Sequence, residues 1–202
     1  MIVPGKLLKH LPAHRVLSKG DSTGPIFLTF DDGPSDHTMN LLDLLDRNST
    51  CATFFVVGNA AKQRPDVMLE IVRRGHSIGN HSLKHQAFAK QPLSAQIEEI
   101  ETTDAIIFDT SGTRSIGFRP PQGRCTPRLL WWLIRNGIRL VHWNYDSLDY
   151  KRDMDLTQNL FNERRPKRGD VLLFHDDCEF AGQFLAENLS RWIAGTDFAA
   201  IA

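Results

Sequence analysis

Short runs of β-forming apolar residues alternate with longer stretches of helical periodicity, and this alternation constrains the fold more than any other feature. The expected strands lie at 25–30, 51–57, around Ile78, and at 116–118, 138–143 and 171–174. The expected helices cover 41–45, 65–74, 93–108, 128–136, 156–164 and 184–192. Repeated strand–helix units favour a parallel sheet, either doubly wound or closed into a barrel.

Length and composition indicate a single globular domain and exclude some classes of function. A chain of 202 residues, 41% apolar and 24% charged, suits one substantial core. Its 24 basic and 24 acidic residues balance, which gives no electrostatic reason to expect nucleic-acid binding. The three cysteines, Cys51, Cys125 and Cys178, have no CxxC spacing, so neither a disulfide framework nor a thiolate zinc site is predicted.

Residues 1–24 precede the first expected strand and are interpreted as a leader to a domain spanning 25–202. Prolines and charged residues interrupt the leader, so it lacks the continuous apolar stretch of a secretory signal. No later run is long enough for a transmembrane segment. We therefore expect a cytoplasmic protein, unless a signal sequence was removed. The basic and leucine-rich leader also permits weak membrane-surface contact, and packing of the leader against the domain is an equal alternative.

Polar side chains collect where the expected strands end. These residues are Asp31, Asp32, His81, His85, Arg119, Asp146, Asp149, His175 and Asp176. In parallel β/α folds the carboxyl ends of the strands form one rim, where sites assemble. The order of elements therefore predicts that these distant groups lie near one another.

Two of these pairs have the residue types of a metal site. Adjacent carboxylates at Asp31 and Asp32 repel each other unless one meets a cation, and successive residues point in different directions. His81 and His85 are four residues apart, a spacing that places two imidazoles on one side of a helical turn, where they can share a metal. Imidazole with carboxylate suits zinc and similar divalent metals. Each pair alone also fits a solvated turn or surface histidines.

Two further segments could serve catalysis. The bend at 118–124 joins two prolines to a glycine, so its backbone could direct an N–H at a developing oxyanion. Arg119 could orient a carboxylate, and His175 leaves a buried strand. Taken alone, the bend is better explained as a stiff surface loop with a structural arginine, and a histidine that leaves a buried strand is often only a hydrogen-bonded core residue.

Together the segments carry a resemblance that none carries alone. In order, they read TFDDGP at 29–34, NHSLKH at 80–85, RPPQG at 119–123, DSLDY at 146–150 and LFH at 173–175. This pattern resembles the five signature motifs of the NodB-like polysaccharide deacetylases, carbohydrate esterase family four. The resemblance implies a distorted (β/α) barrel of seven strands. It also implies a hydrolase that removes N-acetyl groups from an amino-sugar-containing glycan or glycan precursor, releasing acetate. The absent signal and the basic leader add the expectation of a lipid-linked sugar substrate at the inner membrane face.

The resemblance assigns chemical roles to particular positions. It implies one divalent metal, expected to be zinc although other divalent metals can serve, with three ligands: Asp32, His81 and His85. Asp31 corresponds to the general base, which Arg119 orients. His175 corresponds to the general acid, and Asp149 to the carboxylate that tunes it.

The implied substrate-binding residues include two departures from the family pattern. Pro121, Gln122, Tyr150 and Leu173 correspond to residues that contact the substrate, with the Gln122 N–H donating to the oxyanion. The family usually has an aromatic residue at Gln122 and a tryptophan at Tyr150. The first change keeps a backbone donor and the second keeps an aromatic wall. The two departures therefore affect the identity of the substrate more than the reaction itself.

Two other functions remain as alternatives. The same site could hydrolyse another acyl amide, such as a formamide or a cyclic amide. A catalytically silent glycan-binding domain is a different class, and such a domain is expected to lose Asp31 or His175. Both residues are present here.

Overall fold

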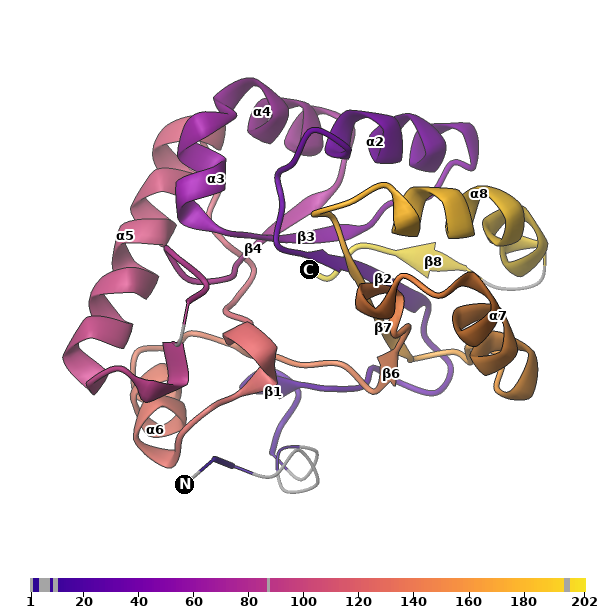
Figure 1. Ribbon diagram of the computed structural model, residues 1–202. Helices are drawn as coiled ribbons and strands as arrows, with labels where there is room; N and C mark the ends of the chain where they lie inside the picture. Colours follow the sequence, from indigo (N-terminus) through magenta and orange to yellow (C-terminus); the bar gives the residue numbers. More distant parts are fainter. Residues whose placement is uncertain (1, 4–7, 9–10, 87, 195–196) are drawn as a thin grey trace.

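A parallel sheet occupies the centre of the molecule (Figure 1). The computed structural model describes residues 2–3, 8, 11–86, 88–194 and 197–202. The order of the main strands is β4 (Ser77–Asn80), β3 (Thr53–Val56), β2 (Ile26–Asp31), β7 (Val171–His175) and β6 (Tyr145–Asp146). Each neighbouring pair is parallel, so the carboxyl ends of these strands share one edge.

The sheet continues beyond β4 through isolated bridges. Phe118 bridges Asn80 on one side and Leu140 on the other. Leu140 begins β5 (Leu140–Val141), which pairs in parallel with β1 (Val16–Leu17). Near the start of β2, β8 (Phe198–Ala199) adds another parallel pairing. The curved layer that results agrees with the distorted (β/α) barrel predicted from the sequence.

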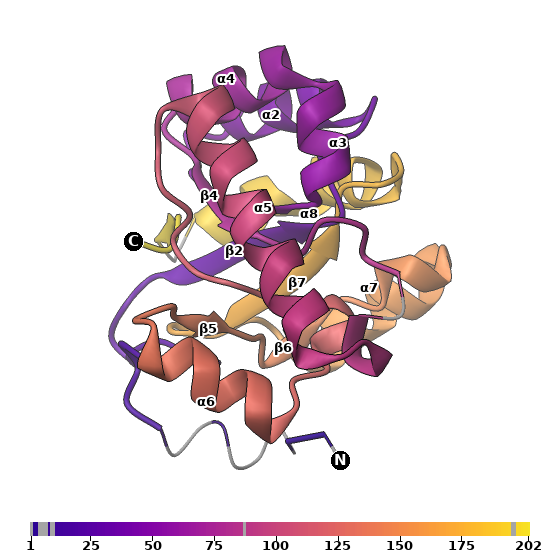
Figure 2. The ribbon, with the colours of Figure 1, turned by 90° about the vertical axis from the view of Figure 1, so that its left-hand side faces the viewer.

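Helices surround this layer on the outside (Figures 1 and 2). They are α2 (Thr38–Arg47), α3 (Gly58–Gln63), α4 (Pro65–Arg73), α5 (Leu93–Ser111), α6 (Pro127–Arg135), α7 (Met154–Glu163) and α8 (Phe180–Ile193). Short 3₁₀ turns lie at η1 (Phe88–Lys90), η2 (Pro121–Gly123) and η3 (Asp149–Lys151). The helices bury the outer face of the sheet, and the strand residues on that face are apolar. Phe30 of β2 is fully buried, and its ring stacks on Phe54 with centroids 5.1 Å apart.

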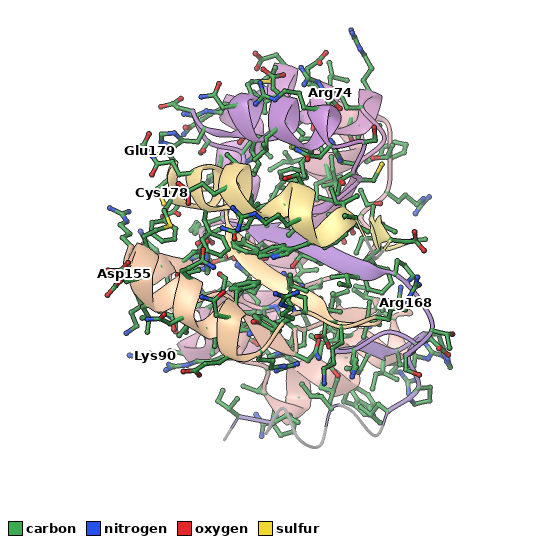
Figure 3. The ribbon with its side chains drawn as sticks, turned by 90° about the vertical axis from the view of Figure 1, so that its right-hand side faces the viewer. Arg74, Lys90, Asp155, Arg168, Cys178 and Glu179 are labelled. Atoms are coloured by element: carbon green, nitrogen blue, oxygen red, sulfur yellow. The ribbon has the colours of Figure 1, made fainter. Side chains whose placement is uncertain are left out.

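Figure 3 shows which edge of the sheet carries the carboxyl ends of the strands. Arg168 precedes β7, whereas Cys178 and Glu179 follow it, and these labels lie at opposite sides of the view. Lys90, before α5, and Asp155, in the first turn of α7, lie on the same side as Cys178. The loops that leave the strands therefore gather at this edge.

Several expected elements differ from the structure. The segment 116–118 forms bridges rather than a named strand, and the strand expected at 138–143 is confined to Leu140–Val141. The elements β1, β6, β8 and α3 were not expected, because two-residue strands and a six-residue helix are too short to show periodicity. Gly58 begins α3, and a larger residue would not fit at this position because a Cβ there would lie 2.6 Å from Thr103 Oγ1 on α5.

The leader contributes apolar side chains to the interior. Leu8 and Val16 are buried in a cluster with Phe88 and Phe118, and Leu17 is buried as well. These side chains are unavailable to a bilayer in this conformation, which favours packing of the leader over membrane contact. Every helix in the described part of the chain is too short or too polar to cross a membrane.

Candidate active site

The three predicted metal ligands meet at the carboxyl edge of the sheet. Asp32 directly follows β2, and His81 directly follows β4. The Oδ1 atom of Asp32 lies 3.4 Å from His81 Nε2 and 3.2 Å from His85 Nε2. One ligand atom from each residue lies within 4.8 Å of the other two.

The bonding of these groups fits a divalent cation. His81 Nδ1 lies 2.7 Å from the Arg119 carbonyl oxygen, so Nδ1 must carry the proton and Nε2 presents a lone pair to Asp32. Burial lowers the pKa of His81 and outweighs its neighbouring carboxylates, which keeps the imidazole neutral, as a metal ligand must be. Asp32 Oδ1 is buried without a hydrogen-bond partner among the described residues. A cation would satisfy that oxygen.

The two histidines do not share a helical turn, contrary to the expectation from their spacing. Residues 81–85 form a loop between β4 and η1. Ser82 and His85 have φ values of 67° and 61°, and these left-handed conformations turn the loop back toward β2. The loop therefore brings the two imidazoles together.

Arg119 holds Asp31 from beneath the site. Its fully buried guanidinium donates to Asp31 Oδ1 at 2.7 Å and to Thr29 Oγ1 at 2.8 Å. The guanidinium carbon lies 3.9 Å from the centre of the Phe55 ring. Burial alone would raise the pKa of Asp31, but the charges of Arg119 and His175 and the hydrogen bond from Arg119 outweigh it and hold that pKa below its usual value. Asp31 is therefore a carboxylate at neutral pH.

The pKa of His175 is shifted in the opposite direction to that of Asp31. Its Nδ1 lies 2.7 Å from Asp149 Oδ1, and its backbone N–H donates to Asp149 Oδ2 at 2.7 Å. Burial alone would lower the pKa of His175, but the hydrogen bond and charge of Asp149, with help from Asp31 and Asp32, raise it to about 9. The imidazole is therefore protonated at neutral pH, with Nε2–H free to donate.

These groups line one cleft of about 350 Å³. Its lining comprises Asp31, Asp32, His81, His85, Gln122, Trp143, Asp146, Tyr150, Leu173 and His175. Of the other predicted site residues, Arg119 and Asp149 contact the lining from behind. Pro121 is buried immediately before Gln122 and lies outside the lining. Its contact with the substrate stays a prediction.

Sequence reasoning gave no role to two residues of the lining. Trp143 stacks on His142, with ring centroids 4.2 Å apart, and faces the cleft beside Gln122. The sequence predicts Trp143 as the last residue of a strand over 138–143, whereas the strand in the structure ends at Val141. Asp146 was noted only as a polar residue at a strand end. Burial raises the pKa of its carboxyl group.

We expect Asp149→Asn to lower the pKa of His175, because the change removes the charge that stabilises the imidazolium. A raised folded-state pKa stabilises the protein below the ordinary value of 6.5, and this stabilisation is lost as pH rises through about 9. The free energy of unfolding of the wild type should therefore fall across this window more than that of the variant. NMR titration of chelator-treated protein measures the pKa directly. An imidazole that still titrates near the wild-type value would contradict the pairing.

This chain matches a family of known proteins. The model of the family described as polysaccharide deacetylase matches residues 18–141, which is more than half of the chain. The chain belongs to this family. The resemblance inferred from the five motifs is thereby confirmed.

Individual relatives agree with this membership. A peptidoglycan-N-acetylglucosamine deacetylase of Bacillus cereus is 33% identical over 153 residues, covering 74% of this chain and 55% of the relative. The chain thus spans only about half of that protein. A chitooligosaccharide deacetylase of Sinorhizobium fredii is 31% identical, covering 85% of this chain and 81% of the relative.

A solved structure extends the agreement to the fold. It is a peptidoglycan N-acetylglucosamine deacetylase in complex with 4-naphthalen-1-yl-N-oxidanyl-benzamide. It superposes with a TM-score of 0.84 at 28% identity and covers 92% of this chain and 90% of the solved chain. The fold class predicted from the sequence is confirmed.

Proposed function

We propose that this polysaccharide deacetylase family member removes N-acetyl groups from amino-sugar glycans and depends on a divalent metal. The observation that carries the proposal is the gathering of a carboxylate, an imidazole and a metal triad in one cleft. Asp31 accepts a hydrogen bond from Arg119, and His175 Nδ1 lies 2.7 Å from Asp149 Oδ1; these partners lower the pKa of Asp31 and raise that of His175. Asp32, His81 and His85 lie beside them in the same cleft. A general base, a general acid and a metal triad can together catalyse amide hydrolysis.

Two side chains of the protein carry out the two proton transfers of this reaction, one as a base and one as an acid. A divalent cation, which we propose to be zinc, would be held by Asp32, His81 and His85 and would polarise the acetyl carbonyl and activate water. Asp31 accepts the proton from the attacking water, and Arg119 keeps that carboxylate ionised and oriented. His175 donates its Nε2 proton to the departing amine. The N–H of Gln122 is assigned, from the family pattern, to the developing oxyanion.

The proposed substrate is a glycan containing N-acetylglucosamine. The relatives' names refer to peptidoglycan and to chitooligosaccharides, which share this sugar. Trp143 and Tyr150 offer aromatic faces in the cleft, and Tyr150 is half exposed. Such rings suit the apolar face of a sugar. If the protein acts in the cytoplasm, as we propose, the substrate would be a small glycan or a lipid-linked precursor at the inner membrane face.

We expect acetate release from N-acetylated glycans to require a divalent metal. The test is a panel of chitooligosaccharides, peptidoglycan, N-acetylated sugar nucleotides and a formamide, with and without chelator, followed by zinc, cobalt or manganese. Activity that disappears with chelator and returns with metal supports the proposal. Activity on the formamide alone would favour the other acyl amide. Saturable glycan binding with no release under any metal would favour the silent domain.

A further inference from the structure

The two histidines of the proposed metal site are held in different ways. His81 is only 2% exposed, its backbone N–H donates to the Val56 carbonyl, and its Nδ1 donates to the Arg119 carbonyl. A third of the His85 side chain is exposed. Among the described contacts, the only hydrogen bond of His85 is from its backbone N–H to Ser82 Oγ. The direction of the His85 ring therefore depends on the path of its loop.

That path needs support from outside the loop. Ser82 and His85 both adopt positive φ without being glycine, and each such residue costs about 1–2 kcal/mol relative to an ordinary conformation. A loop left to itself would relax toward cheaper conformations and carry the His85 ring away from Asp32. Contacts elsewhere must hold the loop against this tendency.

A buried carboxylate on α5 supplies one such contact. Glu99 is 6% exposed. Its Oε2 accepts the consecutive backbone N–H groups of Leu83 and Lys84, both at 3.1 Å. Its Oε1 accepts from Gln91 Nε2 at 2.9 Å. Hydrogen bonds to an ionised acceptor are about twice as strong as neutral ones. The Glu99 carboxylate therefore fixes the backbone of Leu83 and Lys84, in the middle of the loop.

The opposite side of the loop is held as well. The first two N–H groups of α3, from Gly58 and Asn59, donate to the carbonyl oxygens of Ser82 and Leu83. The loop therefore lies between helix N–H donors on one side and the Glu99 carboxylate on the other. Both Glu99 oxygens are engaged by N–H groups, so Glu99 serves the loop rather than the metal.

We propose that Glu99 is a positioning residue of the metal site, which fixes the loop so that His85 meets Asp32 and His81. This inference rests on the proposed function, because it assumes that the triad holds a metal. It predicts that an isosteric change on α5, outside the cleft lining, weakens metal binding. It also predicts that the effect passes through His85 alone.

The test compares Glu99→Gln with Glu98→Gln, which removes the same charge from an exposed position one residue away. Zinc affinity is measured by competition with a chelating dye, and ligand geometry by the visible absorption of the cobalt-loaded protein. Glu99→Gln should lose about tenfold to a hundredfold in affinity, the range for outer-shell partners of metal ligands. Its cobalt spectrum should shift. Glu98→Gln should match the wild type in both measurements.

A double-mutant cycle separates positioning from general destabilisation. Adding Glu99→Gln to His85→Ala should cost no further metal affinity, because the ligand that Glu99 positions is already gone. Should Glu99→Gln fail to fold, Glu99→Asp keeps the charge but retracts it from the loop, and it should show the same loss. Wild-type affinity in Glu99→Gln, or equal losses with and without His85, would overturn the positioning role alone. No metal binding by the wild type would overturn the proposed function and this inference with it.

Discussion

Replacing His81 or His85 with alanine is expected to weaken metal binding strongly while leaving a residual affinity that can still be measured, because each change removes one of the three proposed protein donors. The loss of affinity should exceed the roughly 10–100-fold that outer-shell changes cause. His81→Ala should be the more severe. Its ring is buried and also satisfies the Arg119 carbonyl, so its removal leaves a buried acceptor unpaired. Elemental analysis of the purified, zinc-equilibrated proteins gives the occupancy.

His14→Ala is the matched control, because His14 is an exposed histidine outside the site. It should retain full occupancy. Full occupancy in both His81→Ala and His85→Ala would show that the metal, if bound, is bound elsewhere. Circular dichroism on the same samples separates loss of ligand from loss of fold.

The motif residues were predictable from the sequence because strand ends are a topological feature. A buried apolar strand followed by polar residues shows where a chain leaves the sheet, and parallel topology then places distant residues such as Asp31 and His175 on one rim. The register of β2 with β7 pairs these two residues directly. No knowledge of loop conformation was required for this part of the site.

The residues that support the site were not predictable in the same way. The partnership of Asp31 with Arg119 was expected from the family pattern, but the burial of the guanidinium against Phe55 depends on packing between strands. The pairing of His85 with His81 was attributed to a helical turn, whereas backbone φ angles and the distant Glu99 create it. Local spacing cannot reveal a contact that α5 makes across 15 residues.

The same limit explains the missed strands. Both β1 and β8 have two residues each and owe their conformation to the partner strand they join, not to periodicity of their own. The expected strand over 138–143 includes Trp143, whereas the observed strand ends at Val141 and Trp143 lines the cleft.

Asp31→Asn and His175→Ala are expected to keep their metal and fold yet lose most of their turnover. Neither residue belongs to the Asp32, His81, His85 triad, so occupancy should persist. Positioned acid–base groups typically contribute about a hundredfold to ten-thousandfold each. Asp36→Asn, at an exposed carboxylate whose one ion pair within the described part of the chain is with Arg64, is the control and should change the rate little.

The pH profile tests the two roles separately. The wild-type rate should fall at low pH as Asp31 becomes protonated and at high pH as His175 loses its proton, because the base must be ionised and the acid protonated. Since Asp149 raises the pKa of His175, Asp149→Asn should move the alkaline limb to lower pH. His175→Ala should lack the part of that limb that belongs to the imidazole. If metal-loaded Asp31→Asn turned over near the wild-type rate, Asp31 would not be the general base. Family membership would still stand, because it rests on the match of the family model to residues 18–141 and not on this proton transfer.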